Sequence, residues 1–389
     1  MKFNFETLER RNGDSAKWNA VKSKTDREDY LAFSVADSDY AVAPAIQSAL
    51  ENRVSHGAFG YAAASENYYH AIMRWFETRY ALPIRKHWIV PAPKVLNALA
   101  VIIKQYSKPG EKVCIQTPVY HVFKPMIETN GREVVENELL YSKDGYAIDF
   151  EALEKAFASG VKVFILTSPH NPVGRVWTHD ELSKMVRLAK KYDVFVASDE
   201  IHADVIMQGN TFVSIGQFFD DYDKMAIIGA ASKTFNIAGL QSAHIVIADN
   251  DVRKTIKHAY RELHIGTPNL LALKAVEAAY GESGEWVDAQ NRHVEANYEA
   301  LKSFWEKHDA KAHVLPLEGT YLAWVHIGFT GMDSETFHKA LLEKEAVMVA
   351  DGKKFGGDGA SFIRINLACS RAQLDEGLSR IGNFLRSIQ

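Results

Sequence analysis

Residues 226–241 read AIIGAASKTFNIAGLQ. An apolar run of strand length leads into small residues, then into Ser232 and Lys233, then into a turn with Asn236 and Gly239. Lys233 therefore follows a buried strand and has no acidic neighbour. A surface lysine needs no such surroundings. A lysine that forms a Schiff base does, because its amine must be neutral and desolvation lowers the pKa of an amine. This stretch alone does not decide between a surface lysine and a Schiff-base lysine.

Apolar runs of the same kind recur along the chain. Each is rich in Val, Ile or Ala and none alternates, which is typical of strands buried on both faces of a mostly parallel sheet. The runs cover residues 112–118, 161–169, 193–200, 224–232 and 242–249. Helical periodicity occupies 95–107 and 178–192, the second starting with a capping box of Thr178 and Glu181. Alternating strands and helices predict an α/β domain.

The pattern changes after residue 284. A long helical segment at 286–308 precedes apolar strands at 320–327 and 361–368, and an amphipathic helix closes the chain at 371–388. We therefore predict a large cofactor-binding domain over residues 46–283, with a mostly parallel sheet flanked by helices. Residues 1–45 and 284–389 form a predicted smaller α+β domain.

Composition excludes several classes of protein. The 389 residues include 45 basic and 49 acidic ones, with a net charge of -4, which argues against a nucleic-acid partner. The two cysteines, Cys114 and Cys369, provide neither a disulfide framework nor a metal-binding pair. The N-terminus lacks an apolar leader and no run approaches a membrane span of ~20 residues, so we expect a cytoplasmic protein without membrane contact. The GxGxxG, Walker and GxSxG motifs are absent.

Polar residues follow four of the predicted strands. Ligands gather at the carboxyl ends of strands in open parallel sheets. Tyr120, Asn171, Asp199 and Lys233 occupy those places and suit a flat, anionic, pyridine-like cofactor. The lysine would bind an aldehyde, the aspartate a ring N–H⁺, the asparagine a phenolic oxygen, and the tyrosine would stack on the ring. Simpler interpretations are a strand-end cap for Asp199, an Asn-Pro turn at Asn171 and a core aromatic at Tyr120.

Longer motifs carry a family resemblance. SPHNPVGRVW (168–177), SDEIHADV (198–205) and SKTFNIAGL (232–240) resemble fold-type I pyridoxal-phosphate enzymes of the aminotransferase class I/II superfamily. VADSDYAVAP (35–44), HGAFGY (56–61), GTYLAW (319–324) and FIRINLAC (362–369) resemble its cystathionine β-lyase, or cysteine-S-conjugate β-lyase, branch. The resemblance implies pyridoxal 5'-phosphate in a Schiff base on Lys233, which also abstracts the substrate's Cα proton. Asp199 then keeps the pyridine nitrogen protonated.

The resemblance also implies contacts with the substrate. Arg364 is a charged residue within an apolar strand and needs an anion, which becomes the substrate α-carboxylate; an internal salt bridge is the alternative. Ala36 and Asp37 belong to a loop beside the substrate. Tyr321 lines the same space or is a core residue of the small domain.

His202 lies three residues after Asp199, and the resemblance places it beside the phenolic side of the cofactor. No metal site is predicted here. Asp199 and Glu200 are adjacent, so on a strand they point to opposite faces, and no second histidine stands at ligand spacing.

The phosphate site departs from the superfamily pattern. Ala230 stands where a hydroxyl residue is usual, and Gln241 stands where an arginine is usual. The start of the helix at Lys94 and Val95 supplies backbone N–H groups and a charge in their place, although Lys94 is equally a solvated lysine at a helix start. Ser232 adds a hydroxyl. Tyr61 resembles a tyrosine that reaches the phosphate from a neighbouring subunit, which implies a homodimer with shared sites.

The resemblance favours α,β-elimination from L-cystathionine or another cysteine S-conjugate, giving pyruvate, ammonia and a thiol. An aminotransferase of aromatic or other bulky amino acids is the alternative, because the same lysine serves both reactions. A regulatory protein-binding role on this fold is a third hypothesis.

Overall fold

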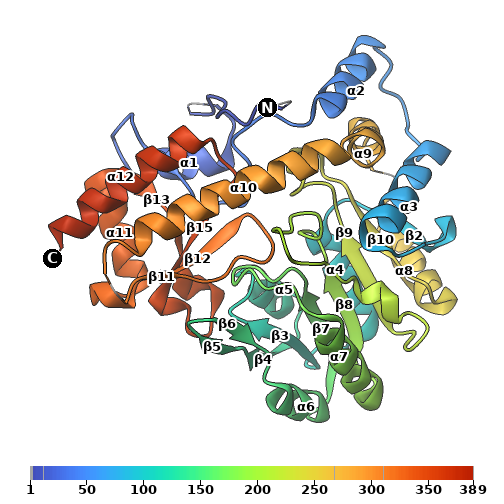
Figure 1. The fold of residues 1–389 in the computed structure, drawn as a ribbon. Helices are drawn as coiled ribbons and strands as arrows, with labels where there is room; N and C mark the ends of the chain where they lie inside the picture. The colour runs from blue at the N-terminus through green and yellow to red at the C-terminus, as the bar shows by residue number, and fades with distance from the viewer. Residues whose placement is uncertain (1–2, 12, 267, 310, 389) are drawn as a thin grey trace.

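The computed structural model describes residues 3–11, 13–266, 268–309 and 311–388. A seven-stranded sheet forms the centre of the larger part of the molecule (Figure 1). Its order is β2-β10-β9-β8-β7-β3-β4. The bounds are β2 Ile89–Ala92, β3 Lys112–Thr117, β4 Glu133–Glu138, β7 Val161–Thr167, β8 Phe195–Asp199, β9 Met225–Gly229 and β10 Ala243–Val246. The predicted α/β fold with a mostly parallel sheet is confirmed.

One strand runs against the others. β10 is antiparallel to both β9 and β2, whereas the pairs β3–β4, β3–β7, β7–β8 and β8–β9 are parallel. The sequence analysis did not predict two strands of this sheet, β2 and β4. β2 reads IVPA, which is buried but only four residues long and interrupted by Pro91. β4 reads EVVENE and is mostly exposed at the sheet edge, so it gives no apolar run.

The central strands are buried on both faces, which explains why their apolar runs do not alternate. In β7, Phe164 and Leu166 pack into one apolar cluster and Val163 and Ile165 into another. The first cluster includes side chains of α6 (Phe150–Ala158) and α7 (His179–Tyr192), and the second includes those of α4 (Val95–Tyr106) and α8 (Asn250–Glu262). Helices thus cover both faces (Figure 1).

The predicted capping box of α7 is confirmed. The backbone N–H of Glu181 donates to Thr178 Oγ1 over 3.2 Å, and the N–H of Thr178 donates to Glu181 Oε2 over 2.8 Å. The two hydrogen bonds satisfy donors that the helix itself leaves free, and such a cap contributes about 1 kcal/mol. The capping box fixes the residue at which the loop after β7 ends and α7 begins.

A second, four-stranded antiparallel sheet has the order β11-β12-β15-β14. Its strands are β11 His313–Val314, β12 Leu322–His326, β14 Ala350–Asp351 and β15 Phe362–Asn366. The neighbouring helices are α10 Gly284–Trp305, α11 Ser334–Glu345 and α12 Arg371–Ser387. The N-terminal strand β1 (Leu31–Ala32) pairs in parallel with β13 (Val347–Met348), and α1 (Ala16–Lys22) lies with these C-terminal elements (Figure 1). On the basis of the β1–β13 pairing, we propose that residues 46–283 form the large domain. Residues 1–45 and 284–389 together form the small domain.

The remaining helices and strands connect these layers. They are α2 Pro44–Ser55, α3 Glu66–Tyr80, α5 Phe123–Thr129, α9 Leu270–Glu282, β5 Leu140–Ser142 and β6 Gly145–Ala147. Short 3₁₀ helices are η1 Lys86–Trp88, η2 Ile215–Phe218, η3 Ala238–Leu240, η4 Gly328–Thr330, η5 Gly352–Phe355 and η6 Gly359–Ser361. Across the described ranges, no helix combines the length and apolar character needed to cross a bilayer.

Candidate active site

A cavity of about 270 Å³ lies where the central strands end. Its walls include all four residues that the sequence places after those strands, namely Tyr120, Asn171, Asp199 and Lys233. The strands β3, β7, β8 and β9 are parallel, so their carboxyl ends meet at one edge of the sheet. Residues separated by more than a hundred positions therefore face a common space.

Lys233 has the electrostatic surroundings of a nucleophilic amine. Burial lowers the pKa of Lys233 to about 8, and the Arg364 guanidinium acts in the same direction, while Asp37 and Asp199 oppose the shift. Its Nζ donates a hydrogen bond of 2.6 Å to the backbone oxygen of Ala36. A substantial fraction of the amine is therefore neutral in mildly alkaline solution, as attack on an aldehyde requires.

Two residues that the sequence analysis did not select hold the loop that carries Lys233. Thr234 Oγ1 donates to Asp204 Oδ2 over 2.8 Å. The side chain of Asn236 accepts from Ser38 N–H over 3.2 Å and donates to Ser38 O over 2.9 Å. Asn236 has a φ of 57°, a left-handed conformation that asparagine tolerates better than most residues. The only sequence signal was an asparagine in a turn, which does not reveal its partner.

Asp199 is a buried carboxyl with spare hydrogen-bonding capacity. Its Oδ1 accepts one backbone hydrogen bond, from Ile201 N–H over 3.2 Å. Desolvation raises the pKa of Asp199 to about 7, against the opposing effects of that hydrogen bond and of Lys233. A cationic N–H donor in the cavity would restore the charged form. Glu200 is directed elsewhere, since Ser214 and the backbone of Ile215 bind it.

Arg364 and Asn171 form one unit. The Nη1 of Arg364 donates to Asn171 Oδ1 over 2.8 Å, and its Nη2 donates to Ser34 O over 2.7 Å. The guanidinium carbon lies 4.8 Å from the centre of the Phe355 ring. No Asp or Glu among the described residues pairs with Arg364, which is 3% exposed, and burial lowers its pKa to about 10. A buried cation without a counter-ion is suited to bind an anionic ligand.

Another group of residues in the cavity lining suits a phosphate. Helix α4 begins there, its N-cap Lys94 provides no side-chain cap, and Lys94 and Val95 both line the cavity. The first backbone N–H groups of the helix therefore remain available to an anion. Ser232 also lines the cavity, and so does Ser242, whose Oγ is buried. The sequence analysis missed Ser242, because it lies nine residues after the lysine and just outside the quoted motif.

The remaining predicted residues lie in different places. Ala36 and His202 line the cavity, and burial lowers the pKa of His202 to about 3, so its ring is neutral. Tyr321 is fully buried behind the wall, and its hydroxyl donates to Ala36 O over 3.1 Å. Asp37 is not among the lining residues. Tyr61 is fully exposed and does not reach the cavity within one chain.

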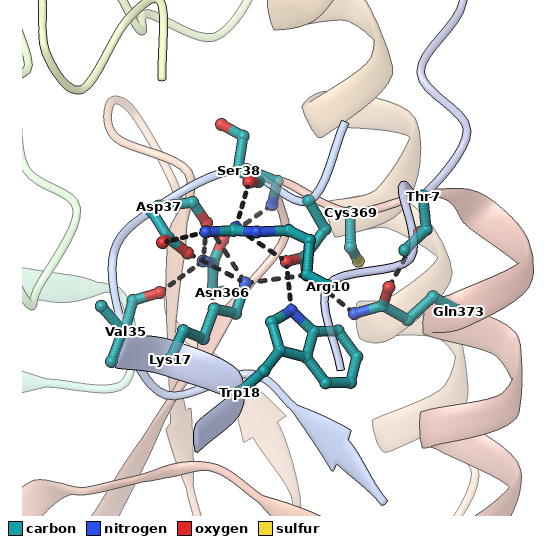
Figure 2. Close-up of polar contacts among 12 residues, drawn as sticks. Thr7, Arg10, Lys17, Trp18, Val35, Asp37, Ser38, Asn366, Cys369 and Gln373 are labelled. Atoms are coloured by element: carbon teal, nitrogen blue, oxygen red, sulfur yellow. Dashed lines mark hydrogen bonds and ion pairs between the residues drawn. The ribbon is translucent and has the colours of Figure 1, made fainter. Parts of the chain in front are cut away.

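Asp37 belongs to a polar cluster behind the loop that carries Ala36 (Figure 2). Lys17, which is 1% exposed, contacts Asp39 Oδ2 over 2.8 Å and Asp37 O over 3.2 Å. Asp39 also accepts hydrogen bonds from Trp18 Nε1 and Gln373 Nε2, each over 2.9 Å. Asn366 donates to Val35 O and Asp37 O, each over 2.7 Å. Buried charges thus hold the loop whose carbonyl receives Lys233.

Fold and site together define the chain as a member of the aminotransferase class I and II family, whose model matches residues 28–381. The chain is 35% identical to cystathionine beta-lyase PatB of Bacillus subtilis (strain 168), covering 97% of this chain and 98% of the relative. The structure of cystalysin from Treponema denticola, which contains pyridoxal 5'-phosphate, matches with a TM-score of 0.96, 33% identity and full coverage of both chains.

A putative aminotransferase from Clostridium difficile 630, with bound pyridoxal phosphate, matches with a TM-score of 0.94 and 35% identity. The match covers 98% of this chain and 100% of that one. The family expected from the sequence motifs is therefore confirmed. The names of the relatives include both a lyase and an aminotransferase, so the choice of reaction depends on the site.

Proposed function

We propose that this chain is a pyridoxal-phosphate-dependent carbon–sulfur lyase. It removes the thiol from L-cystathionine or a related cysteine S-conjugate by α,β-elimination, which leaves pyruvate and ammonia. The observation that carries the proposal is the desolvated amine of Lys233, set in one cavity with the buried carboxyl of Asp199 and the unneutralised Arg364. The 35% identity to a named cystathionine beta-lyase over almost the whole chain supports the choice of reaction.

The residues present fit the cofactor. The amine of Lys233 suits the aldehyde, and Asp199 suits the pyridine nitrogen, since no cationic group among the described residues donates a hydrogen bond to its carboxyl. Asn171 accepts from Arg364 through Oδ1, which leaves its amide N–H groups for the phenolic oxygen. Tyr120 and His202 complete the ring site. Ser232, Ser242, Lys94 and the start of α4 suit the phosphate in place of the residues that Ala230 and Gln241 replace.

The bound cofactor supplies an electron sink for the pair left when the substrate's Cα proton is removed. Lys233 moves that proton, and its lowered pKa matches such a base near neutral pH. Arg364 holds the α-carboxylate, and its bonds to Asn171 and Ser34 fix the plane of the guanidinium. Proton removal and departure of the thiolate from Cβ then follow one another within a single orientation of the substrate.

We extend the proposal to a homodimer in the cytoplasm. Tyr61 and Phe59 project from an irregular segment between α2 and α3 and are strongly exposed, as expected for side chains that meet a second copy. The partner's copy of this tyrosine would then contact the phosphate. Both cysteines are free thiols, which is usual in a reducing compartment.

The test uses purified enzyme with pyridoxal phosphate and L-cystathionine. Pyruvate and free thiol in the absence of any 2-oxo acid support the lyase. Strict dependence on a 2-oxo acid supports the aminotransferase alternative, which the name of the Clostridium relative favours. Borohydride reduction of the loaded enzyme identifies the lysine. The label is expected on the peptide with Lys233 and is lost in Lys233→Ala, but not in Lys224→Ala, whose lysine pairs with Asp193 at the surface.

A further inference from the structure

A second cavity, of about 340 Å³, adjoins the active site. The two cavities share Ala36, Tyr120 and Lys233, and the second also includes Arg364. Apart from His121, the rest of its wall comes from the small-domain elements, and these carry four charged or imidazole side chains that the proposed reaction leaves unused: Lys24, His338, Asp351 and Lys354. They share this cavity with the guanidinium of Arg364, which would hold the reacting end of the substrate.

Two of these side chains are lysines whose ammonium groups make no ion pair with a described residue. Lys24 and Lys354 are exposed, and neither forms an ion pair within the described residues. The adjacent Lys353 behaves differently: it pairs with Glu335 over 3.0 Å and does not line the cavity. Burial lowers the pKa of His338, and Lys24 and Lys354 act in the same direction, while the hydrogen bond to Val349 and the Asp351 carboxylate oppose the shift.

The other two offer hydrogen-bond acceptors. His338 Nδ1 lies 2.8 Å from Val349 O and must donate to it, so a neutral ring presents Nε2 as an acceptor. Asp351 accepts from Ser334 Oγ over 2.6 Å and from the N–H of Lys353 over 3.1 Å, both on Oδ1. Oδ2 receives no hydrogen bond from any described residue. Within the described residues, two ammonium groups without an ion pair thus share a cavity wall with a carboxylate and an imidazole that have free acceptor atoms.

We propose that this second cavity binds the far end of the substrate and selects for a far end that is itself an α-amino acid. Lys24 and Lys354 bind the far carboxylate, and Asp351 and His338 Nε2 bind the far ammonium group. The inference rests on the proposed function. It predicts that a dipolar thioether such as L-cystathionine is preferred to a cysteine S-conjugate of equal length with an apolar far end.

The first experiment compares the holoenzyme on L-cystathionine and on S-propyl-L-cysteine, which has the same carbon chain without the far amino and carboxyl groups. Pyruvate release gives kcat/KM for each, and their ratio is the selectivity. We expect a wild-type ratio of about ten or more, falling as ionic strength rises, because the lysines are solvent-exposed.

Variants then locate the selectivity. Lys354→Ala and Lys24→Ala should each lower the ratio about three- to tenfold, and Asp351→Asn should lower it through the ammonium end. Lys353→Ala is the matched control and should leave the ratio at its wild-type value. A ratio near one in the wild-type enzyme, or an equal loss on both substrates in Lys354→Ala, overturns the inference, because the second result assigns Lys354 to the reacting end.

Binding separates this inference from the proposed function. The non-cleavable analogues 2,7-diaminosuberic acid and 2-aminoheptanoic acid replace the sulfur by a methylene group, and calorimetric titration of the holoenzyme gives their dissociation constants. Tighter binding of the first, lost in Lys354→Ala, supports the second cavity even if no pyruvate is released. Pyruvate release without any difference between the analogues supports the lyase and contradicts the second cavity.

Discussion

Lys17→Met tests whether the cluster behind the Ala36 loop stabilises the fold through its buried ion pair. The Lys17 side chain is 1% exposed, and that of its partner Asp39 is 0% exposed. Methionine fills nearly the same volume, so the change removes a charge and leaves little cavity. Asp39 then remains as a buried carboxylate without its closest cation.

The expected cost is about 3 kcal/mol. Removal of one partner from a buried pair costs about 3–5 kcal/mol. The lower end applies, because Trp18 and Gln373 still donate to Asp39 and Arg10 lies 3.4 Å from it. For a chain of this length, about 2 cal/mol/K of unfolding entropy per residue converts that cost into a fall in Tm of about 3–5 °C.

Lys22→Met is the control on the same helix. Lys22 and its partner Glu28 are 37% and 72% exposed, so solvent screens this pair and its loss should change the stability little. The double variant Lys17→Met with Asp39→Asn removes both charges and should recover part of the lost stability. Thermal unfolding of all three variants is followed by circular dichroism. Equal Tm values for the two single variants would refute the reasoning, because the buried pair would then be no stronger than the surface pair.

Three further predictions concern the active site. Burial raises the folded-state pKa of Asp199 to about 7, so its contribution to apoprotein stability is full below about pH 4 and is lost as the pH rises through about 7. Asp199→Asn should therefore raise the Tm of the apoprotein at pH 8 but not at pH 4. The same substitution should weaken pyridoxal phosphate binding. A rise in Tm at pH 4 alone would contradict the predicted direction of the pH dependence. Arg364→Lys cannot keep two anchoring bonds and still present a planar pair of donors, so kcat/KM for L-cystathionine should fall about 100-fold, against no change for the exposed control Arg371→Lys. Mixing inactive Tyr61→Phe and Lys233→Ala chains in equal amounts should restore about a quarter of wild-type activity if sites are shared, because half of the dimers that form are mixed and each of these has one intact site. No restored activity would show that Tyr61 does not complete the site of the partner subunit.

Most of the large sheet, and the polar residues at the carboxyl ends of its strands, could be predicted from the sequence because they depend on local sequence patterns. A strand buried on both faces needs an uninterrupted apolar run, and the residue after it is where a parallel sheet exposes polar groups. This reasoning selected Tyr120, Asn171, Asp199 and Lys233, and one cavity contains all four. It missed β2 and β4, and it did not reveal that β10 is antiparallel, since strand direction leaves no mark on a short apolar run.

Pairings between distant residues were decided only by the tertiary structure. Arg364 and Asn171 are 193 positions apart, and nothing in either motif shows that they share a hydrogen bond. The family resemblance predicts that Asp37 lies in a loop beside the substrate, and only the structure shows that its carboxylate contacts Arg10 and Lys17. The place of Ser242 in the cavity wall and the hydrogen bond of Thr234 to Asp204 are likewise visible only in the folded structure. Hydrophobic periodicity depends on neighbours along the chain, so the sequence alone predicts it. The partner of a buried polar group depends on which surfaces the packed domains bring within 3 Å, and only the folded chain sets that distance.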